Sequence, residues 1–368
     1  MKLYYKIKIL TLICFILPVI VCSCRNRGEV TTGGITRLIT DAAGRNVAIP
    51  DTVKSVVAIR PGTLRLLSYM RVTDRVGYIE GNEKIRNIPY LMANPDLRNL
   101  EIIGTGNNYD TELLAACDAE LIISTFMNSA EADRLQKITG KPVFLLEYGN
   151  MGNRIEDLFR SLKLLGEVFY CWHRADTLIS YINQTITELK SFSSGSQKEG
   201  ITVYIGGVAY SGSHGITSTV PGYPPFNFLS LNNSASVIES MMKSSGIAQD
   251  NAFIEKEQLI TWNPDYIFLD ASGIAIWENE IADPALKNTL KALKEGEIYI
   301  VLPYNWYTVN YENLLCNSWF IAGILFPERI SETELEQKYR EIYKFFLGTD
   351  IFDDLKKLYN PFTRFEIS

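Results

Sequence analysis

One stretch of the sequence, from Asn153 to Phe192, constrains the fold more than any other. Apolar side chains recur there in steps of three and four, which places them on one face of an α-helix. They are Ile155, Leu158, Phe159, Leu162, Leu165, Phe169, Trp172, Ile179, Ile182, Ile186 and Leu189. At about 1.5 Å per residue, a helix of this length spans about 60 Å, which is longer than one compact domain needs.

The ends and the charges of this stretch indicate a connecting helix. Asn153 can cap the first turn, with Glu156 in the capping-box position three residues later. Charged side chains such as Lys163 exclude a membrane span, and no similar helix elsewhere could pair with it. We therefore predict that residues 153–193 form one rigid helix between two lobes. A break into two helices at Gly166 is the alternative, and it also leaves two globular halves.

Apolar strands alternate with helices on both sides of this stretch, which is typical of α/β lobes with largely parallel sheets. With 368 residues, the chain is long enough for two such lobes, expected at 38–152 and 194–368. After a short hairpin within 41–50, strands are expected at 53–59, 75–79, 101–104, 120–123, 142–146, 201–205, 266–269 and 297–301. Helices are expected at 63–70, 110–116, 130–139, 236–243, 284–294, 313–325 and 332–346.

The first 24 residues read as an export signal rather than as part of the fold. Lysines precede an apolar run at 9–21, which is short for a transmembrane helix. The sequence Val-Cys-Ser-Cys ending at Cys24 resembles a bacterial lipoprotein cleavage site, with Cys24 as the acylated residue. Cys22 is an alternative acylation site, and a plain signal peptide is the other interpretation. Residues 25–37 then form a polar tether.

Charge and cysteine content exclude some classes of function. The net charge of −6 and the lack of a basic stripe with interleaved aromatics argue against a nucleic-acid binder. Three of the six cysteines fall in the leader; the others, Cys117, Cys171 and Cys316, have no metal-ligand spacing. We expect them to be small core residues, with one disulfide possible.

Short motifs follow one another in a fixed order along the chain. They are Asp41-Ala-Ala-Gly-Arg45 with Val56-Val57-Ala58, then Ile103-Gly104 with Glu112-Leu-Leu and Asp118-Ala-Glu-Leu-Ile-Ile123, and finally Glu257-Gln-Leu-Ile-Thr-Trp-Asn-Pro-Asp265-Tyr-Ile-Phe268. In this order the chain resembles the periplasmic substrate-binding proteins of ABC importers for iron complexes and cobalamin. The similarity runs from about Leu38 to Leu347. The segment Gly206–Pro225 is longer and richer in glycine and aromatics than in many members, which leaves the ligand open but not the class.

This resemblance implies a fold and a function. The two lobes would face each other across a ligand cleft lined by loops at the carboxyl ends of the strands. The protein would carry no cofactor of its own and would bind a ferric siderophore or similar metal chelate, with haem or a cobalamin-like corrinoid as alternatives. It would act as a monomer, lipid-anchored in the periplasm or at the cell surface, and would deliver its ligand to an ABC permease and its ATPase.

Candidate ligand residues follow predicted strands. Arg60 ends the first buried strand, where its guanidinium could fork onto an anionic ligand; closure of a local turn is the alternative. Tyr210 and His214 lie in a glycine-rich loop and could stack on a macrocycle or reach a metal. Tyr223, with Phe226, would extend this aromatic surface, unless the loop packs only on itself.

A second aromatic group follows the strand that ends at Val301. Tyr304, Asn305 and Trp306 suit a partly apolar ligand with polar edges, although aromatic packing between the lobes explains them equally well. Only two histidines occur, too few for the three imidazoles that receptors for bare Zn²⁺ or Mn²⁺ usually need.

In the resembling family, one glutamate on each lobe docks into arginines of the permease, and Glu112 and Glu257 match those positions. Ordinary solvated acids are the alternative. Two other functions compete with import. A metal-dependent hydrolase or reductase using the cleft is one, but no HExxH, CxxC or GxSxG pattern supports it. A surface scavenger or sensor that works without a permease is the other.

Overall fold

The computed structural model describes residues 35–106, 108–194, 200–244 and 250–366. The chain divides into two units, Met1–Ile35 and Thr36–Ser368, and the second contains all the elements considered below. The predicted leader, the lipidation site Cys24 and most of the tether lie outside the described residues, so these stay predictions.

The first sheet is formed by five parallel strands in the order β5-β4-β3-β6-β7. They are β3 (Val56–Ile59), β4 (Val76–Ile79), β5 (Glu101–Ile102), β6 (Leu121–Ser124) and β7 (Val143–Leu145). All residues of β3 and β6 are buried, as expected for central strands covered on both faces. The helices of this lobe are α1 (Thr63–Tyr69), α2 (Pro89–Ala93), α3 (Thr111–Ala116) and α4 (Ser129–Thr139), and the hairpin pairs β1 (Thr36–Thr40) with β2 (Asn46–Pro50).

The second sheet has the order β10-β8-β12-β13-β14 and is parallel except for its last strand. Its strands are β8 (Thr202–Gly206), β10 (Asn232–Asn233), β12 (Tyr266–Asp270), β13 (Ile298–Val301) and β14 (Thr363–Arg364). A small antiparallel pair joins β9 (Ser218–Thr219) to β11 (Ala252–Phe253). The helices of this lobe are α7 (Pro224–Phe228), α8 (Ser236–Ser244), α9 (Lys256–Trp262), α10 (Ile274–Ile281), α11 (Pro284–Lys287) and α12 (Lys291–Glu295).

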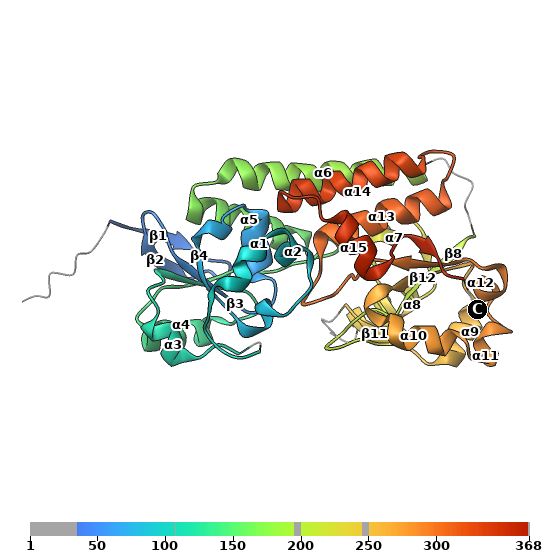
Figure 1. The fold of residues 1–368 in the computed structure, drawn as a ribbon, viewed down its shortest axis with the longest axis horizontal. Coiled ribbons are helices and arrows are strands. Elements are labelled where there is room, and N and C mark those ends of the chain that lie inside the picture. Colours follow the sequence, from blue (N-terminus) through green and yellow to red (C-terminus); the bar gives the residue numbers. More distant parts are fainter. Residues whose placement is uncertain (1–34, 107, 195–199, 245–249, 367–368) are drawn as a thin grey trace, which may run out of the picture. The chain divides into compact units, whose positions relative to one another are not determined.

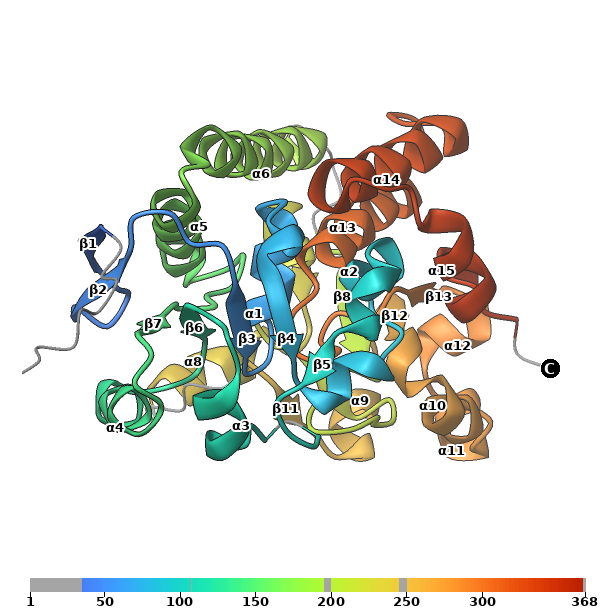
Figure 2. The same ribbon diagram turned by 60° about the vertical axis from the view of Figure 1, so that its left-hand side comes forward.

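A layer of long helices connects the two sheets. It contains α5 (Ile155–Phe169), α6 (Trp172–Ser193), α13 (Tyr311–Leu325), α14 (Glu332–Leu347) and α15 (Phe352–Tyr359). Figures 1 and 2 both show α6 and α14 along one side of the sheets, and α13 contacts both of these helices. The expected α/β class with two mostly parallel sheets is confirmed.

The predicted single helix over 153–193 is wrong, because the segment forms the two helices α5 and α6. The break is at Tyr170, which has a left-handed backbone (φ 56°), and not at Gly166. Gly166 instead allows close packing of α6, since a Cβ there would lie 3.2 Å from the Cβ of Ala175. The capping box is also absent, because α5 starts after Arg154 without a side-chain cap.

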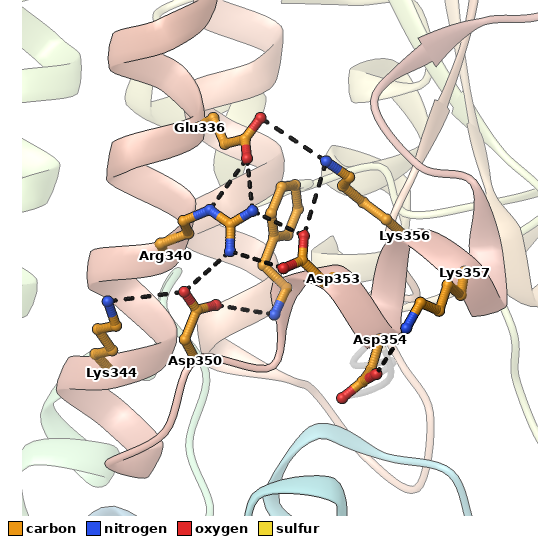
Figure 3. Close-up of polar contacts among 9 residues, drawn as sticks. Glu336, Arg340, Lys344, Asp350, Asp353, Asp354, Lys356 and Lys357 are labelled. Atoms are coloured by element: carbon orange, nitrogen blue, oxygen red, sulfur yellow. Dashed lines mark hydrogen bonds and ion pairs between the residues drawn. The ribbon is translucent and has the colours of Figure 1, made fainter.

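An ion-pair network fixes the last helix to α14 (Figure 3). The Arg340 guanidinium contacts Glu336 at 2.6 Å, Asp353 at 2.7 Å and Asp350 at 3.0 Å. Lys356 adds longer contacts to Glu336 and Asp353. A network of this kind holds the α14–α15 turn better than any one exposed pair, because a single arginine serves three carboxylates.

The expectation that the three cysteines are core residues holds for Cys316, which is buried, but not for Cys117 and Cys171, which are half-buried. Cys117, Cys171 and Cys316 are all free thiols, so the disulfide considered above does not form. Within the part of the chain that the structure describes, every helix is too short or too polar to cross a membrane. No group of three or more His, Cys, Asp or Glu side chains is placed there to hold a metal ion.

Candidate functional site

The carboxyl ends of both sheets carry the residues that the sequence singled out. Arg60 directly follows β3, the loop with Tyr210 and His214 follows β8, and Tyr304–Trp306 follow β13. This placement agrees with the general position of ligand sites in parallel sheets.

A buried arginine holds these two edges together. Arg65, on α1, is fully buried, and its guanidinium donates to the Tyr148 hydroxyl at 2.7 Å and to the Val309 carbonyl at 2.8 Å. It also donates to the Asn310 side chain at 2.8 Å and to the Trp306 carbonyl at 3.1 Å. We call these five residues the Arg65 network. The network ties the first lobe to the segment that follows β13.

Two buried acids lie beside this network. Glu80 accepts a hydrogen bond from the Tyr307 hydroxyl at 2.8 Å, and Glu83 accepts one from Tyr90 at 2.6 Å. Burial raises the pKa of Glu80, and it raises the pKa of Glu83 to about 7. Glu83 is therefore partly protonated near neutral pH.

A cavity of about 740 Å³ lies between the start of α5, the helix α6 and the second lobe. Its walls come from Asn150–Ile155, from Asn183, Ile186 and Lys190 on α6, and from Val220, Pro221, Gly222, Pro224, Asn227, Phe228, Glu239, Met242, Asp250 and Tyr304. Residues from both sheets' loops therefore face one space. The Asn150 amide donates to the Asp250 carboxylate at 3.2 Å across it.

Of the predicted ligand residues, Tyr304 lines this cavity. It is 2% exposed, and its ring packs against Tyr223 with centroids 5.3 Å apart. Tyr223 is fully buried, and its hydroxyl accepts a hydrogen bond from Asn317, so in this structure it supports the wall from behind. Asn305 and Trp306 lie on the same loop but do not line the cavity; Asn305 donates to the carbonyl of Ala209 at 3.0 Å.

The remaining predicted ligand residues are placed elsewhere. Arg60 has a left-handed backbone (φ 71°) and pairs with Glu131 at 2.7 Å. His214 contacts the Tyr210 carbonyl at 2.7 Å and packs edge-on against Phe253, with ring centroids 4.8 Å apart. None of these three predicted residues is part of the cavity wall. Their roles in ligand binding stay predictions.

The two predicted docking acids are exposed. Glu112 lies in the first turn of α3 and Glu257 in the first turn of α9. A partner protein could therefore reach both carboxylates. Their role in docking stays a prediction.

Sequence reasoning missed the residues that build the cavity and the Arg65 network. Arg65 carries no sequence signal for burial, since a lone arginine in a helix usually reaches solvent. The run Tyr148-Gly-Asn150-Met-Gly-Asn153 after β7 does carry a signal, because glycines and asparagines after a strand mark a specific turn. Arg154, Lys190 and Asp250 meet only through the tertiary fold.

Comparison with known proteins identifies the class. A family model described as periplasmic binding protein matches residues 81–304. The chain belongs to the periplasmic binding protein family.

Relatives of this family member share its fold along most of the chain. The molybdate-binding protein MolA of Haemophilus influenzae is 21% identical over 336 residues, covering 85% of this chain and 91% of MolA. The structure of MolA bound to molybdate matches with a TM-score of 0.67 at 19% identity, over 85% of this chain and 98% of that one. A periplasmic solute binding protein from Veillonella parvula matches with a TM-score of 0.68 at 17% identity, over 89% and 97% of the two chains.

The haem-binding protein HutB of Vibrio cholerae is more distant, with a TM-score of 0.53 at 13% identity over 74% of this chain and 99% of that one. Together these matches confirm the two-lobe binding-protein fold expected from the sequence. The relatives are solute-binding proteins and not enzymes, so the hypothesis of a cleft enzyme is set aside.

Proposed function

We propose that this periplasmic binding protein is the solute receptor of an ABC importer and that it holds a metal-bearing solute in the cavity between its lobes. The observation that carries the proposal is the cavity itself, whose walls come from both lobes and from α6. Family membership supports the class, and MolA is described as the cognate binding protein of an ABC transporter.

The size of the cavity favours a chelate over a bare ion. Sites for small organic molecules have volumes of roughly 300–1,000 Å³, and the cavity of about 740 Å³ lies within that range. A ferric siderophore or similar metal chelate is therefore our first candidate. Haem or a corrinoid is the alternative from the same class. Molybdate is the second candidate, because MolA binds it, although a tetrahedral oxyanion would fill only a small part of this space.

In this proposal the protein does no chemistry. Affinity comes from burial of the solute and from the polar groups of the wall, and the partner ATPase supplies the energy for transport. Cys24 would anchor the receptor to a membrane in the periplasm or at the cell surface, and the protein would act as a monomer. The Glu112 and Glu257 carboxylates would orient it on the permease.

A ligand screen tests the proposal. Purified protein is titrated with a ferric catecholate, a ferric hydroxamate, haem, cobalamin and molybdate, and the melting temperature and visible absorbance are recorded. A true ligand gives saturable stabilisation that grows as RT ln(1 + [L]/Kd). Saturable binding of one of the chelates supports the proposal, binding of molybdate alone selects the second candidate, and the absence of any saturable shift contradicts both.

Charge reversal tests the docking role. The double variant Glu112→Lys with Glu257→Lys should abolish import in cells and leave solute binding by the purified protein unchanged. Glu341→Lys is a matched control, because Glu341 is an exposed acid on α14 that plays no part in the proposed docking. Import that persists in the double variant would remove the docking assignment and favour a scavenger or sensor.

A further inference from the structure

One wall of the cavity is formed by the start of α5, a helix of 15 residues. The Asn150 side-chain oxygen accepts a hydrogen bond from the Arg154 N–H at 2.8 Å, and the Arg154 side chain itself caps no N–H. Among the described residues, no side chain accepts from the N–H groups of the first helical turn that follows. A helix start of this kind attracts negative charge. Acidic Glu156 and Asp157 also lie in the first turn, but Glu156 lines a separate shallow groove and neither residue is part of the cavity wall.

Two cations line the cavity beside this helix start. They are Arg154 itself and Lys190 on α6. Among the described residues, neither side chain has an ion pair or a side-chain hydrogen bond, although the structure contains many ion pairs elsewhere, such as Arg60 with Glu131. Surface cations are often unpaired, so these two alone would not identify a site.

The hydroxyl of Tyr304 gives independent evidence for a ligand. The side chain is 2% exposed and lines the cavity, yet its hydroxyl makes no hydrogen bond to any residue that the structure describes. The hydroxyl is not one of the fully buried polar atoms that lack a partner, so it opens onto the cavity and a solute there can reach it. Burial, followed by the nearby Asp250 carboxylate, raises the pKa of Tyr304 well above its usual value. The hydroxyl is therefore a permanent donor at neutral pH.

The wall also contains two carboxylates, those of Asp250 and Glu239, and both are held by other groups of the protein. The Asp250 carboxylate accepts a hydrogen bond from the Asn150 amide. Glu239 lies against the backbone of Gly222 and is engaged within the protein. Arg154, Lys190 and the Tyr304 hydroxyl have no side-chain partner among the described residues, so these donors remain open to a solute.

We infer that the start of α5, Arg154, Lys190 and the Tyr304 hydroxyl form an anion subsite, and that the solute is an anion with acidic oxygens. This inference rests on the proposed function, and it names the charge class of the solute. Carboxylate, catecholate or metal-bound oxo groups would accept charge-assisted hydrogen bonds from the two cations. The receptor would then prefer an anionic chelate to a neutral or cationic one of the same size.

Three ferric chelates of similar size but different charge test the inference. The probes are an anionic tris-catecholate, a neutral trihydroxamate and a cationic trihydroxamate that carries a free ammonium group; molybdate serves as the small anion. Affinities are measured by fluorescence titration at low and high salt. We expect the tightest binding for an anionic probe, and weaker binding of that probe at high salt because the cations are partly screened.

Variants locate the subsite. Arg154→Met with Lys190→Met should weaken binding of the anionic probe by about tenfold or more, while binding of the neutral probe changes by about twofold or less. Tyr304→Phe should weaken binding of the anionic probe by a smaller factor than the double variant does. Lys163→Met is the matched control, because Lys163 is an exposed cation on α5 outside the cavity and its loss should change neither affinity. Circular dichroism checks that each variant is folded.

The outcomes distinguish failure of the anion subsite from failure of the proposed receptor function. Equal binding of the anionic probe by the double variant and by the Lys163→Met control overturns the anion subsite, as does preference for the neutral or cationic chelate. Both results leave the proposed receptor function intact. If no probe binds the parent protein, the receptor function fails and the subsite fails with it.

Discussion

Replacing Arg65 with methionine removes the side chain that ties α1 to the segment after β13. Methionine fills a similar apolar volume but donates no hydrogen bond. Of the four acceptors in the Arg65 network, the Val309 carbonyl keeps its bond from the Tyr148 hydroxyl at 2.6 Å. The Asn310 side-chain oxygen and the Trp306 carbonyl lose their shortest donors, at 2.8 and 3.1 Å.

The expected cost follows from burial. Each buried acceptor left without its donor costs about 1–3 kcal/mol, and loss of one member of a buried charged network typically costs about 3–5 kcal/mol. The substitution also removes the positive charge that lowers the pKa of buried Glu312, a carboxyl whose other neighbour is the Tyr69 hydroxyl. We therefore predict that Arg65→Met lowers the free energy of unfolding by about 3–5 kcal/mol, a large part of the roughly 5–15 kcal/mol of a typical domain.

Urea unfolding followed by circular dichroism measures this change. The midpoint should fall while the slope stays near that of the parent. The urea midpoint of Arg65→Lys should lie between those of Arg65→Met and the parent protein. An ammonium group keeps the positive charge but cannot donate to several acceptors in the planar arrangement of a guanidinium. Arg134→Met, an exposed arginine on α4, is the control and should stay within about 0.5 kcal/mol of the parent. A loss below about 1 kcal/mol in Arg65→Met would refute the reasoning.

Two further predictions concern stability. Burial raises the pKa of Glu83 from 4.5 to about 7, so the folded state binds this proton more tightly than the unfolded state, and stability falls as the pH rises through that window. Glu83→Gln should flatten this fall and be more stable than the parent above pH 7, as measured by urea unfolding across the pH range; an unchanged pH profile would contradict it. Arg340→Met should cost about 1 kcal/mol at low salt and less at high salt, because it removes the shared cation of the α14–α15 network; a loss that salt does not reduce would argue against an ionic origin.

The central strands were predictable because they are buried on both faces, and such burial requires mainly apolar residues. All residues of β3, β6 and β13 are buried, so each appears in the sequence as an uninterrupted apolar run bounded by turn residues. The break between α5 and α6 was not predictable in the same way. Tyr170 adopts a left-handed backbone without being glycine or asparagine, and the apolar periodicity continues across it. Gly166, the visible signal, serves close packing instead.

The candidate site was predictable only in part. The loops that follow β3, β8 and β13 could be named in advance, since parallel strands present their carboxyl ends at one edge, and Tyr304 was found this way. Arg154 and Lys190 could not be found, because they lie 36 positions apart on two helices that were expected to be one. Asp250 belongs to a loop with no distinctive sequence.

The position of the bound metal tests the central claim most directly. A crystal of the protein soaked with the tightest-binding ferric chelate would give an anomalous diffraction signal from iron. We predict one strong iron peak inside the cavity, with the chelate in contact with Arg154 and Tyr304. An iron peak outside the cavity, or a fully bound chelate that touches only one lobe, would contradict the account.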